Sequence, residues 1–218
     1  MTRSLLLAMQ IADSSFPSGA FAFSWGAEAA LADGMLSRGS FGSWLAVEML
    51  QRWHRFDRRV VARAWHCRGG ELEAWDGEVD TLFWAESHRA RSIRAGSAFL
   101  TGAARMDDRA AQDIRAATAA GRMRGHGSVA QGAVFASMGL SIELALTVSA
   151  HATAQGLASA AIRLGMISAI DAQRAYSDLR PALADALAPP DAAERPSAFA
   201  PISEIAMLRP AESRLFAN

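Results

Sequence analysis

The chain contains no lysine, so all 22 of its basic residues are arginine. This absence excludes the P-loop lysine of nucleotide-binding loops, Schiff-base chemistry and lysine general bases. Acidic residues also number 22, and a formal net charge of +0 argues against a nucleic-acid binder, which needs a surplus of positive charge. The composition therefore removes several classes of enzyme and nucleic-acid-binding protein before any motif is considered.

Cysteine is nearly absent as well. Cys67 stands alone, which excludes an internal disulfide and a zinc site built from several thiolates. The start of the chain does not have the pattern of a signal peptide. The longest uncharged stretch, residues 144–162, includes His151 and Gln155 and is rich in Ser, Thr and Ala, so its transfer to lipid is poorly favoured. We expect a cytoplasmic protein that binds neither nucleic acid nor membrane.

Helical periodicity is abundant. Apolar residues recur every three or four positions from Phe41 to Ala64, which predicts one amphipathic helix, or two helices that break near Asp57. Another face carries a row of arginines, which is typical of a solvated face and alternatively of a surface that docks an acidic partner. This row consists of Arg52, Arg55, Arg59 and Arg63.

Similar spacing continues along the rest of the chain and predicts an all-α fold. Helices are expected from Glu71, over residues 89–106, from Asp107 and Asp108 to Ala120, and through most of residues 128–187. Small residues in 89–106 suggest that a neighbouring helix approaches closely. A strand-like alternation is nearly absent. We therefore predict a single-domain bundle of about seven to ten helices over residues 1–188.

The C-terminal part differs in composition. Four prolines with Asp, Glu and Ser over residues 189–201 predict an exposed linker. Residues 202–218 carry enough apolar side chains to form a tail that docks on a partner.

An acidic cluster offers one candidate chemistry. Asp107, Asp108 and Asp113 resemble the aspartate-rich box of prenyl-diphosphate synthases, which are also all-α, and such carboxylates can share magnesium. A magnesium-dependent all-α enzyme of the diphosphate type is therefore the alternative function. Capping of the next helix by Asp107 and Asp108 is the favoured interpretation, because a carboxylate accepts from the helix's first N–H groups.

Two further constellations are weaker. Ser24 lies in a segment that looks faintly like a nucleophile elbow, but such an elbow needs a sheet to hold it. None of the five histidines forms an H-x3-H pair, so no metal site within one helix is predicted. A nickel carrier that uses His66, Cys67 and His126 remains as a third hypothesis, although helix neighbours such as His66 and Cys67 point about 100° apart.

Residues 13–28 resemble the N-terminal motif of the urease accessory protein family UreF, D-S-x-x-P-x-G-x-F-x-x-S-x-G-x-E. Each fixed position of that motif is met. Four later blocks follow in the family's order, so the resemblance covers essentially the whole chain. They are Arg91-Ser92 with Gly96; Gly125-His126 with Val129 and Gly132; 159–164 with Gln173; and 213–216.

The chain also departs from the family pattern. It has Met166, Ser168 and Ala169 where the family usually has a proline and Gly-Gln. It has 209–212 where the family commonly has His-Glu and a tyrosine, and it ends Ala217-Asn218 in place of Arg-Ser.

The resemblance implies an all-α, dimeric helper protein that is not an enzyme and holds no cofactor or metal of its own. Family members bind the accessory protein UreD (UreH) and the nickel-carrying GTPase UreG. They help deliver nickel to apo-urease and control GTP hydrolysis. The residues expected to contact partners are Pro17, Gly19, Phe21, Ser24, Glu28, His126, Arg163, Ile205, Leu208, Ser213, Arg214, Leu215 and Phe216.

Several of these residues have structural alternatives. Pro17 and Gly19 can instead fix a turn while Phe21 packs in the core, and Glu28 is the member of the motif most expected to face a partner. Arg163 is expected on a buried helix, where its charge would need either a structural ion pair or a partner contact. The tail is expected to dock on UreD.

Overall fold

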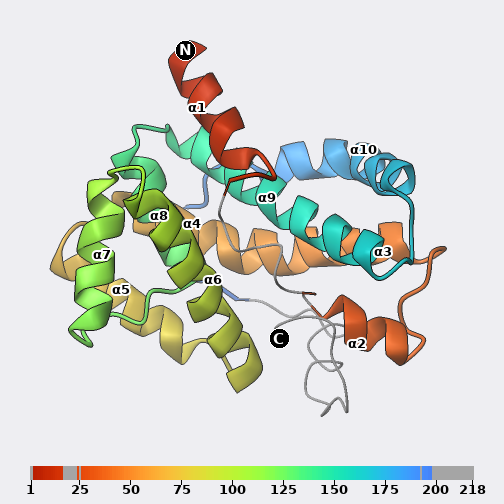
Figure 1. The fold of residues 1–218 in the computed structure, drawn as a ribbon, viewed down its shortest axis with the longest axis horizontal. Coiled ribbons are helices and arrows are strands. Elements are labelled where there is room, and N and C mark those ends of the chain that lie inside the picture. The colour runs from red at the N-terminus through yellow and green to blue at the C-terminus, as the bar shows by residue number, and fades with distance from the viewer. Residues whose placement is uncertain (1, 17–23, 25, 192, 198–218) are drawn as a thin grey trace.

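The computed structural model describes residues 2–16, 24, 26–191 and 193–197, and this part of the chain contains helices and no strand (Figure 1). The predicted all-α fold is confirmed. The elements are α1 (Thr2–Ala12), α2 (Ala27–Ala32), α3 (Phe41–Val47), η2 (Glu48–Asp57), α4 (Arg58–His66), α5 (Gly70–Thr81), α6 (Glu86–Ala104), α7 (Arg109–Ala119), α8 (Gly127–Ser137), α9 (Ile142–Arg163) and α10 (Ala169–Ala186).

The core has two halves. One half lies among α4, α5, α6, α7 and α8, and the other lies among α2, α3, α9 and α10. Helix α9 passes along the second half, with α10 and α3 beside it and α1 across it (Figure 1). The segment from α3 to α4 contributes to both halves, with Trp53 and Val60 fully buried in one each. The long helices thus join the two halves.

The chain does not break near Asp57. Helix α3, the π-helical segment η2 and helix α4 follow one another with helical backbone angles at Val47, Asp57 and Arg58. A π-helix holds more residues in each turn than an α-helix, so its faces rotate relative to the 3.6-residue pattern. As a result charged Arg52 and Asp57 are buried together with the apolar residues of η2. The expected solvated arginine face is therefore wrong at Arg52.

Helices α4 and α8 pack almost backbone to backbone. A Cβ atom at Gly132 would lie 2.4 Å from the carbonyl oxygen of Val61 and 2.7 Å from Cβ of Ala64. No side chain fits in that space, so glycine permits the contact. The predicted family block around Val129 and Gly132 is therefore a packing face in this fold.

The acidic cluster at the start of α7 is explained by capping. The Asp108 carboxylate accepts from the backbone N–H of Ala111 at 2.8 Å, and Asp113 pairs with Arg109 at 3.2 Å. Asp107 lies exposed before the cap. Within the described residues, no group of three or more His, Cys, Asp or Glu side chains could hold a metal ion. The capping interpretation is confirmed for Asp108.

Residues 187–191 and 193–197 follow α10 and lie against η2 and α4. Most are exposed, as predicted, but Pro196 is buried and Ser197 donates its N–H to the Arg55 carbonyl at 2.9 Å. This part of the expected linker is therefore attached to the helical body. None of the helices among the described residues combines the length and apolarity needed to cross a membrane.

Candidate functional site

Two of the sequence blocks meet where α6 faces the turn before α8. Gly96 of α6 touches the turn so closely that a Cβ atom there would lie 2.0 Å from the carbonyl oxygen of Gly125. The small residues predicted to allow close approach do so at this point. On the same helix the Ser92 hydroxyl accepts from the N–H of Gly127 at 3.3 Å. Backbone contact and a side-chain hydrogen bond together fix the turn on α6.

The His126 ring lies at the centre of this junction. It has no exposed surface, and it stacks on Phe83 with ring centroids 4.9 Å apart. Its Nε2 lies 3.1 Å from Asp80 Oδ1, and its Nδ1 lies 3.1 Å from the Ser92 hydroxyl. Because the Asp80 carboxylate accepts, the network places the ring proton on Nε2, and Nδ1 accepts from Ser92.

Burial determines the charge of His126. Desolvation lowers the pKa of His126, while the nearby Asp76 and Asp80 carboxylates oppose that effect. A lowered pKa keeps the imidazole neutral near pH 7. The side chain faces the interior, and its two ring nitrogens already have partners within the fold.

A second acidic residue of α5, Asp76, accepts hydrogen bonds from the backbone of the turn before α8. Asp76 is fully buried, and its Oδ1 accepts from the N–H of His126 at 3.0 Å. Its Oδ2 accepts from the N–H groups of Arg124 at 2.5 Å and Gly125 at 3.1 Å. Three backbone donors on one carboxylate satisfy a loop that has no helical hydrogen bonds of its own.

Sequence reasoning missed Asp76 and Asp80. Their separation of four residues places both on one face of α5, and the buried Trp75 and Val79 are their immediate neighbours. Two carboxylates at this spacing beside apolar residues are the signal that could have found them.

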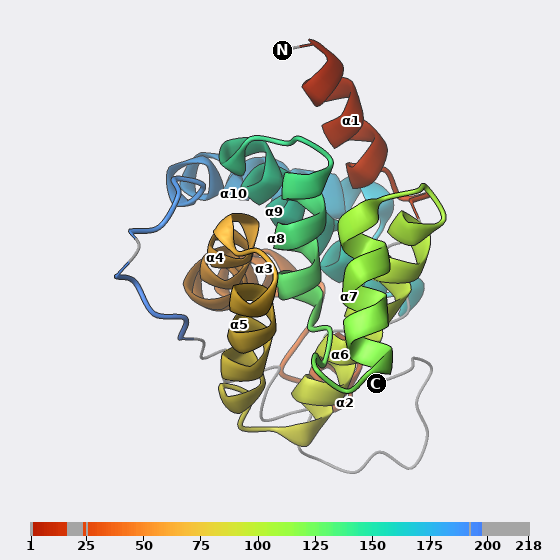
Figure 2. The same ribbon diagram turned by 90° about the vertical axis from the view of Figure 1, so that its left-hand side faces the viewer.

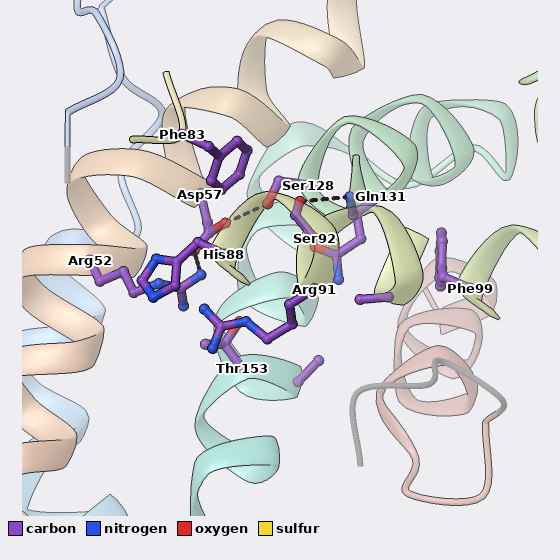
Figure 3. Close-up of a pocket in the computed structure, with 13 residues that line it drawn as sticks. Arg52, Asp57, Phe83, His88, Arg91, Ser92, Phe99, Ser128, Gln131 and Thr153 are labelled. Carbon is purple, nitrogen blue, oxygen red and sulfur yellow. Dashed lines mark hydrogen bonds and ion pairs between the residues drawn. The ribbon is translucent and has the colours of Figure 1, made fainter. Parts of the chain in front are cut away.

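Next to this junction lies a small cavity of about 60 Å³ whose lining includes several charged and polar side chains (Figure 3). Helices η2, α6, α8 and α9 all contribute to its walls. Figure 3 shows His88 and Arg91 of α6 close to Arg52 of η2, with Asp57 pointing to Ser128 of α8. Ser92, Gln131 and Thr153 complete the polar lining.

Positive charge dominates the cavity wall. Burial first, and then the guanidinium groups of Arg91 and Arg52, lower the pKa of His88 to about 2, so its ring is neutral. Arg52 Nη2 lies 3.4 Å from Asp57 Oδ2, and the Ser128 hydroxyl donates to Asp57 Oδ1 at 2.5 Å. Guanidinium and hydroxyl donors of this kind suit a carboxylate or another small anion rather than a metal ion.

The N-terminal motif is described only in part. Ser24 is fully buried, and Glu28 lies half-buried in the first turn of α2. The other expected contact residues of this motif, Pro17, Gly19 and Phe21, lie outside the described residues. So do the expected contact residues of the tail, which are Ile205, Leu208, Ser213, Arg214, Leu215 and Phe216.

The expected burial of Arg163 is wrong. Helix α9 is buried along much of its length, but Arg163 is its last residue and is exposed. Its Nε lies 3.4 Å from the carbonyl oxygen of Ser159, one turn earlier. An apolar sequence neighbourhood predicted burial here, whereas the helix end emerges into solvent.

The residues of the nickel-carrier hypothesis do not form a site. His66 is exposed at the end of α4, and Cys67 after it is buried. Burial raises the pKa of the Cys67 thiol, which disfavours the thiolate that a metal needs. His126 is engaged with Ser92 and Asp80, as described above. A nucleophile elbow at Ser24 also lacks support, because the described residues include no strand.

Comparison with known proteins gives a consistent result. A model of the UreF family matches residues 36–180, which is more than half of the chain. "Urease accessory protein UreF" of Cereibacter sphaeroides is 29% identical over 206 residues, covering 94% of this chain and 89% of the relative. A protein of the same name from Paenarthrobacter aurescens is 27% identical, and the match covers 84% of this chain and 82% of the relative. Another from Mesorhizobium japonicum is 28% identical, and the match covers 81% of this chain and 78% of the relative. The chain belongs to the UreF family of urease accessory proteins.

Proposed function

We propose that this chain is a non-enzymatic adaptor of urease maturation. It acts in the cytoplasm as a homodimer, bridges UreD (UreH) and the UreG GTPase, and assists nickel delivery to apo-urease while modulating GTP hydrolysis. Membership of the UreF family is the observation that carries this proposal. The role assigned to this chain is to position proteins, and the chemistry belongs to its partners.

The hydrogen bonds that hold the helices of this fold together support the role of an adaptor. The family blocks around Ser92, Gly96 and His126 form a junction whose hydrogen bonds end on the chain's own backbone and side chains. Asp108, from the alternative magnesium cluster, caps its own helix. These groups serve to hold helices in register, which an adaptor needs in order to present a fixed surface.

The tail is the proposed contact with UreD. Residues 202–218 include Ile205, Leu208, Leu215 and Phe216, which would bury apolar surface on the partner. Ordering a segment on binding costs conformational entropy, and burial of apolar area must exceed that cost. Pro17, Gly19, Phe21, Ser24, Glu28, His126 and Arg163 remain proposed contributors to the partner surfaces, His126 through the turn that it holds.

A truncation tests this contact. A chain that ends at Ala200 is co-expressed with UreD and compared with the intact chain for the amount of UreD that co-purifies. We expect the truncated chain to lose most of the bound UreD. The double substitution Ile205→Ser and Leu208→Ser should weaken binding in the same direction, whereas Glu204→Gln, which keeps every apolar side chain, should not. Full recovery of UreD with the shortened chain would remove the tail from the proposal.

A further inference from the structure

A strap, defined as the described residues 187–191 and 193–197, lies between α10 and the tail in the sequence. Figure 2 shows it running as a blue trace from α10 down the side of the molecule that carries α4 and α5. Its last described residue, Ser197, is tied to the Arg55 carbonyl. The described chain is therefore held beside η2 just before the tail begins, well after the end of α10.

One carboxylate holds the middle of the strap. Glu194 Oε2 lies 3.2 Å from Arg58 Nη2 and 2.8 Å from Arg59 Nη2. Its other oxygen, Oε1, accepts from the N–H of Asp191 at 3.0 Å, which closes a local turn. Arg59 belongs to the arginine row for which docking of an acidic partner is the alternative interpretation, and it pairs here with an acidic residue of its own chain, as does its neighbour Arg58.

The same arginines also bind the strap's backbone. Arg58 is buried, donates through Nε to the His54 carbonyl at 3.1 Å, and donates through Nη1 to the Ala188 carbonyl. Arg59 donates to the Arg195 carbonyl at 2.6 Å. Since Arg58 is fixed to η2 by its own bond, it presents a prepared site for the strap.

Packing beneath the strap is loose. Pro189 and Pro190 line an open pocket of about 480 Å³ together with Ala62, Trp75 and Ile142. Pro189 is exposed and Pro190 is half-buried, so apolar burial contributes little at this point. The Glu194 side chain is about one-third exposed, so solvent screens its two ion pairs from the carboxylate side. Such a segment opens locally at a much lower free energy than the helical core.

We propose that the strap is a releasable latch, closed by Glu194 on Arg58 and Arg59, that sets the reach of the C-terminal tail. When the latch is closed, the chain is held to the body as far as Ser197. When it is open, the tail starts after α10 and gains 11 residues, about 36–40 Å of extended chain. The role in partner binding rests on the proposed function of the tail, whereas the latch itself does not.

Partner binding then couples to the latch. A partner that engages the tail only when the strap is open must meet the free-energy cost of opening. A change that opens the strap in advance removes that cost and strengthens binding. Closing the latch therefore limits the tail's reach in the isolated protein.

Hydrogen exchange of the intact isolated chain tests the latch directly. Glu194→Gln keeps the size of the side chain and removes its charge, and we expect peptides within residues 187–197 to exchange about fivefold faster. Arg59→Gln should have the same effect. Asp178→Asn, at an exposed acid of α10, removes an equal charge and should leave exchange unchanged. Equal exchange rates in all four proteins would overturn the latch.

Binding to purified UreD tests the coupling. Glu194→Gln should bind about threefold more tightly than the unaltered chain, because the strap is already open. Faster exchange without tighter binding would overturn control of the tail's reach and leave the adaptor function intact. Unchanged UreD binding by a chain that ends at Ala200 would instead contradict the proposed tail contact, and the exchange result would still decide whether the latch exists.

Discussion

At Gly96 a hydrogen atom is the one substituent that the neighbouring turn accommodates. We predict that Gly96→Ala lowers the free energy of unfolding by about 1–3 kcal/mol, because its Cβ would meet the Gly125 carbonyl oxygen at 2.0 Å. Gly77→Ala is the control: it lies in α5 with no atom within 4 Å of the added Cβ, and it should be neutral or stabilising by up to about 1 kcal/mol. Urea denaturation of both variants measures the difference. Equal stability of the two would contradict the close contact.

His88 makes stability depend on pH. Its pKa of about 2 in the folded protein is below the ordinary 6.5, so the unfolded chain binds a proton that the folded chain excludes. The free energy of unfolding should therefore fall as pH is lowered below about 6.5, by about 2 kcal/mol between pH 7 and pH 5 from this residue alone. Burial also lowers the pKa values of His54, His126 and His151, which adds slope of the same sign.

The contribution of His88 can be isolated by substitution. His88→Gln removes the titrating group, and its unfolding free energy should change less between pH 7 and pH 5. His66→Gln, at an exposed histidine, should retain the full slope of the unaltered chain. Parallel pH profiles for His88→Gln and the unaltered chain would show that His88 is not buried in its neutral form.

At the scale of elements, a double substitution at the start of α7 distinguishes helix capping from magnesium binding by the acidic cluster. Asp107→Asn with Asp108→Asn preserves capping, since asparagine is as good an N-cap residue as aspartate, but it removes the charge that magnesium requires. We predict that urease activation by this variant, measured in cells lacking their own UreF, stays within about twofold of the unaltered chain. Abolished activation by a folded variant would favour the magnesium-dependent enzyme.

The apolar spacing of the sequence predicts most of the helices, but it does not predict that η2 is π-helical. Apolar spacing locates the segment from Phe41 to Ala64, because periodicity follows directly from burial of one face. It does not reveal the π-helical turns that bury Arg52 and Asp57. Of the two predicted alternatives at Asp57, the structure has the continuous helical run. Propensity and pattern are local, whereas the Ser128 hydroxyl that donates to the buried Asp57 comes from a distant part of the sequence.

The candidate site, too, is predicted only in part by the sequence. The blocks holding Ser92, Gly96 and His126 were recognised individually, and the small residues of α6 correctly indicated close packing. That these blocks meet, with Asp76 and Asp80 between them, depends on how α5, α6 and α8 are arranged in space. Residues 189–201 are predicted as an exposed linker, yet the anchoring of its first part by Arg58 depends on tertiary contacts.

At the scale of the whole molecule, the proposed role of the fold is to position other proteins, and the proposal assigns the chemistry to those partners. A lysine-free helical body with a polar internal junction, and a tail tied to that body by a strap, fits a protein that assembles others. The UreF family membership gives this arrangement its context in urease maturation. Ser92, Gly96 and His126 secure the internal architecture, so their expected effect on maturation is through the shape of the proposed adaptor.

Co-purification from urease-producing cells tests this account most directly. The intact chain carries an N-terminal affinity tag, and the same tag on a chain that ends at Ala200 serves as the matched control. We predict that UreD, UreG and urease subunits co-purify with the intact chain and that UreD is lost from the control. Recovery of none of these proteins with an intact, folded chain would contradict the adaptor function.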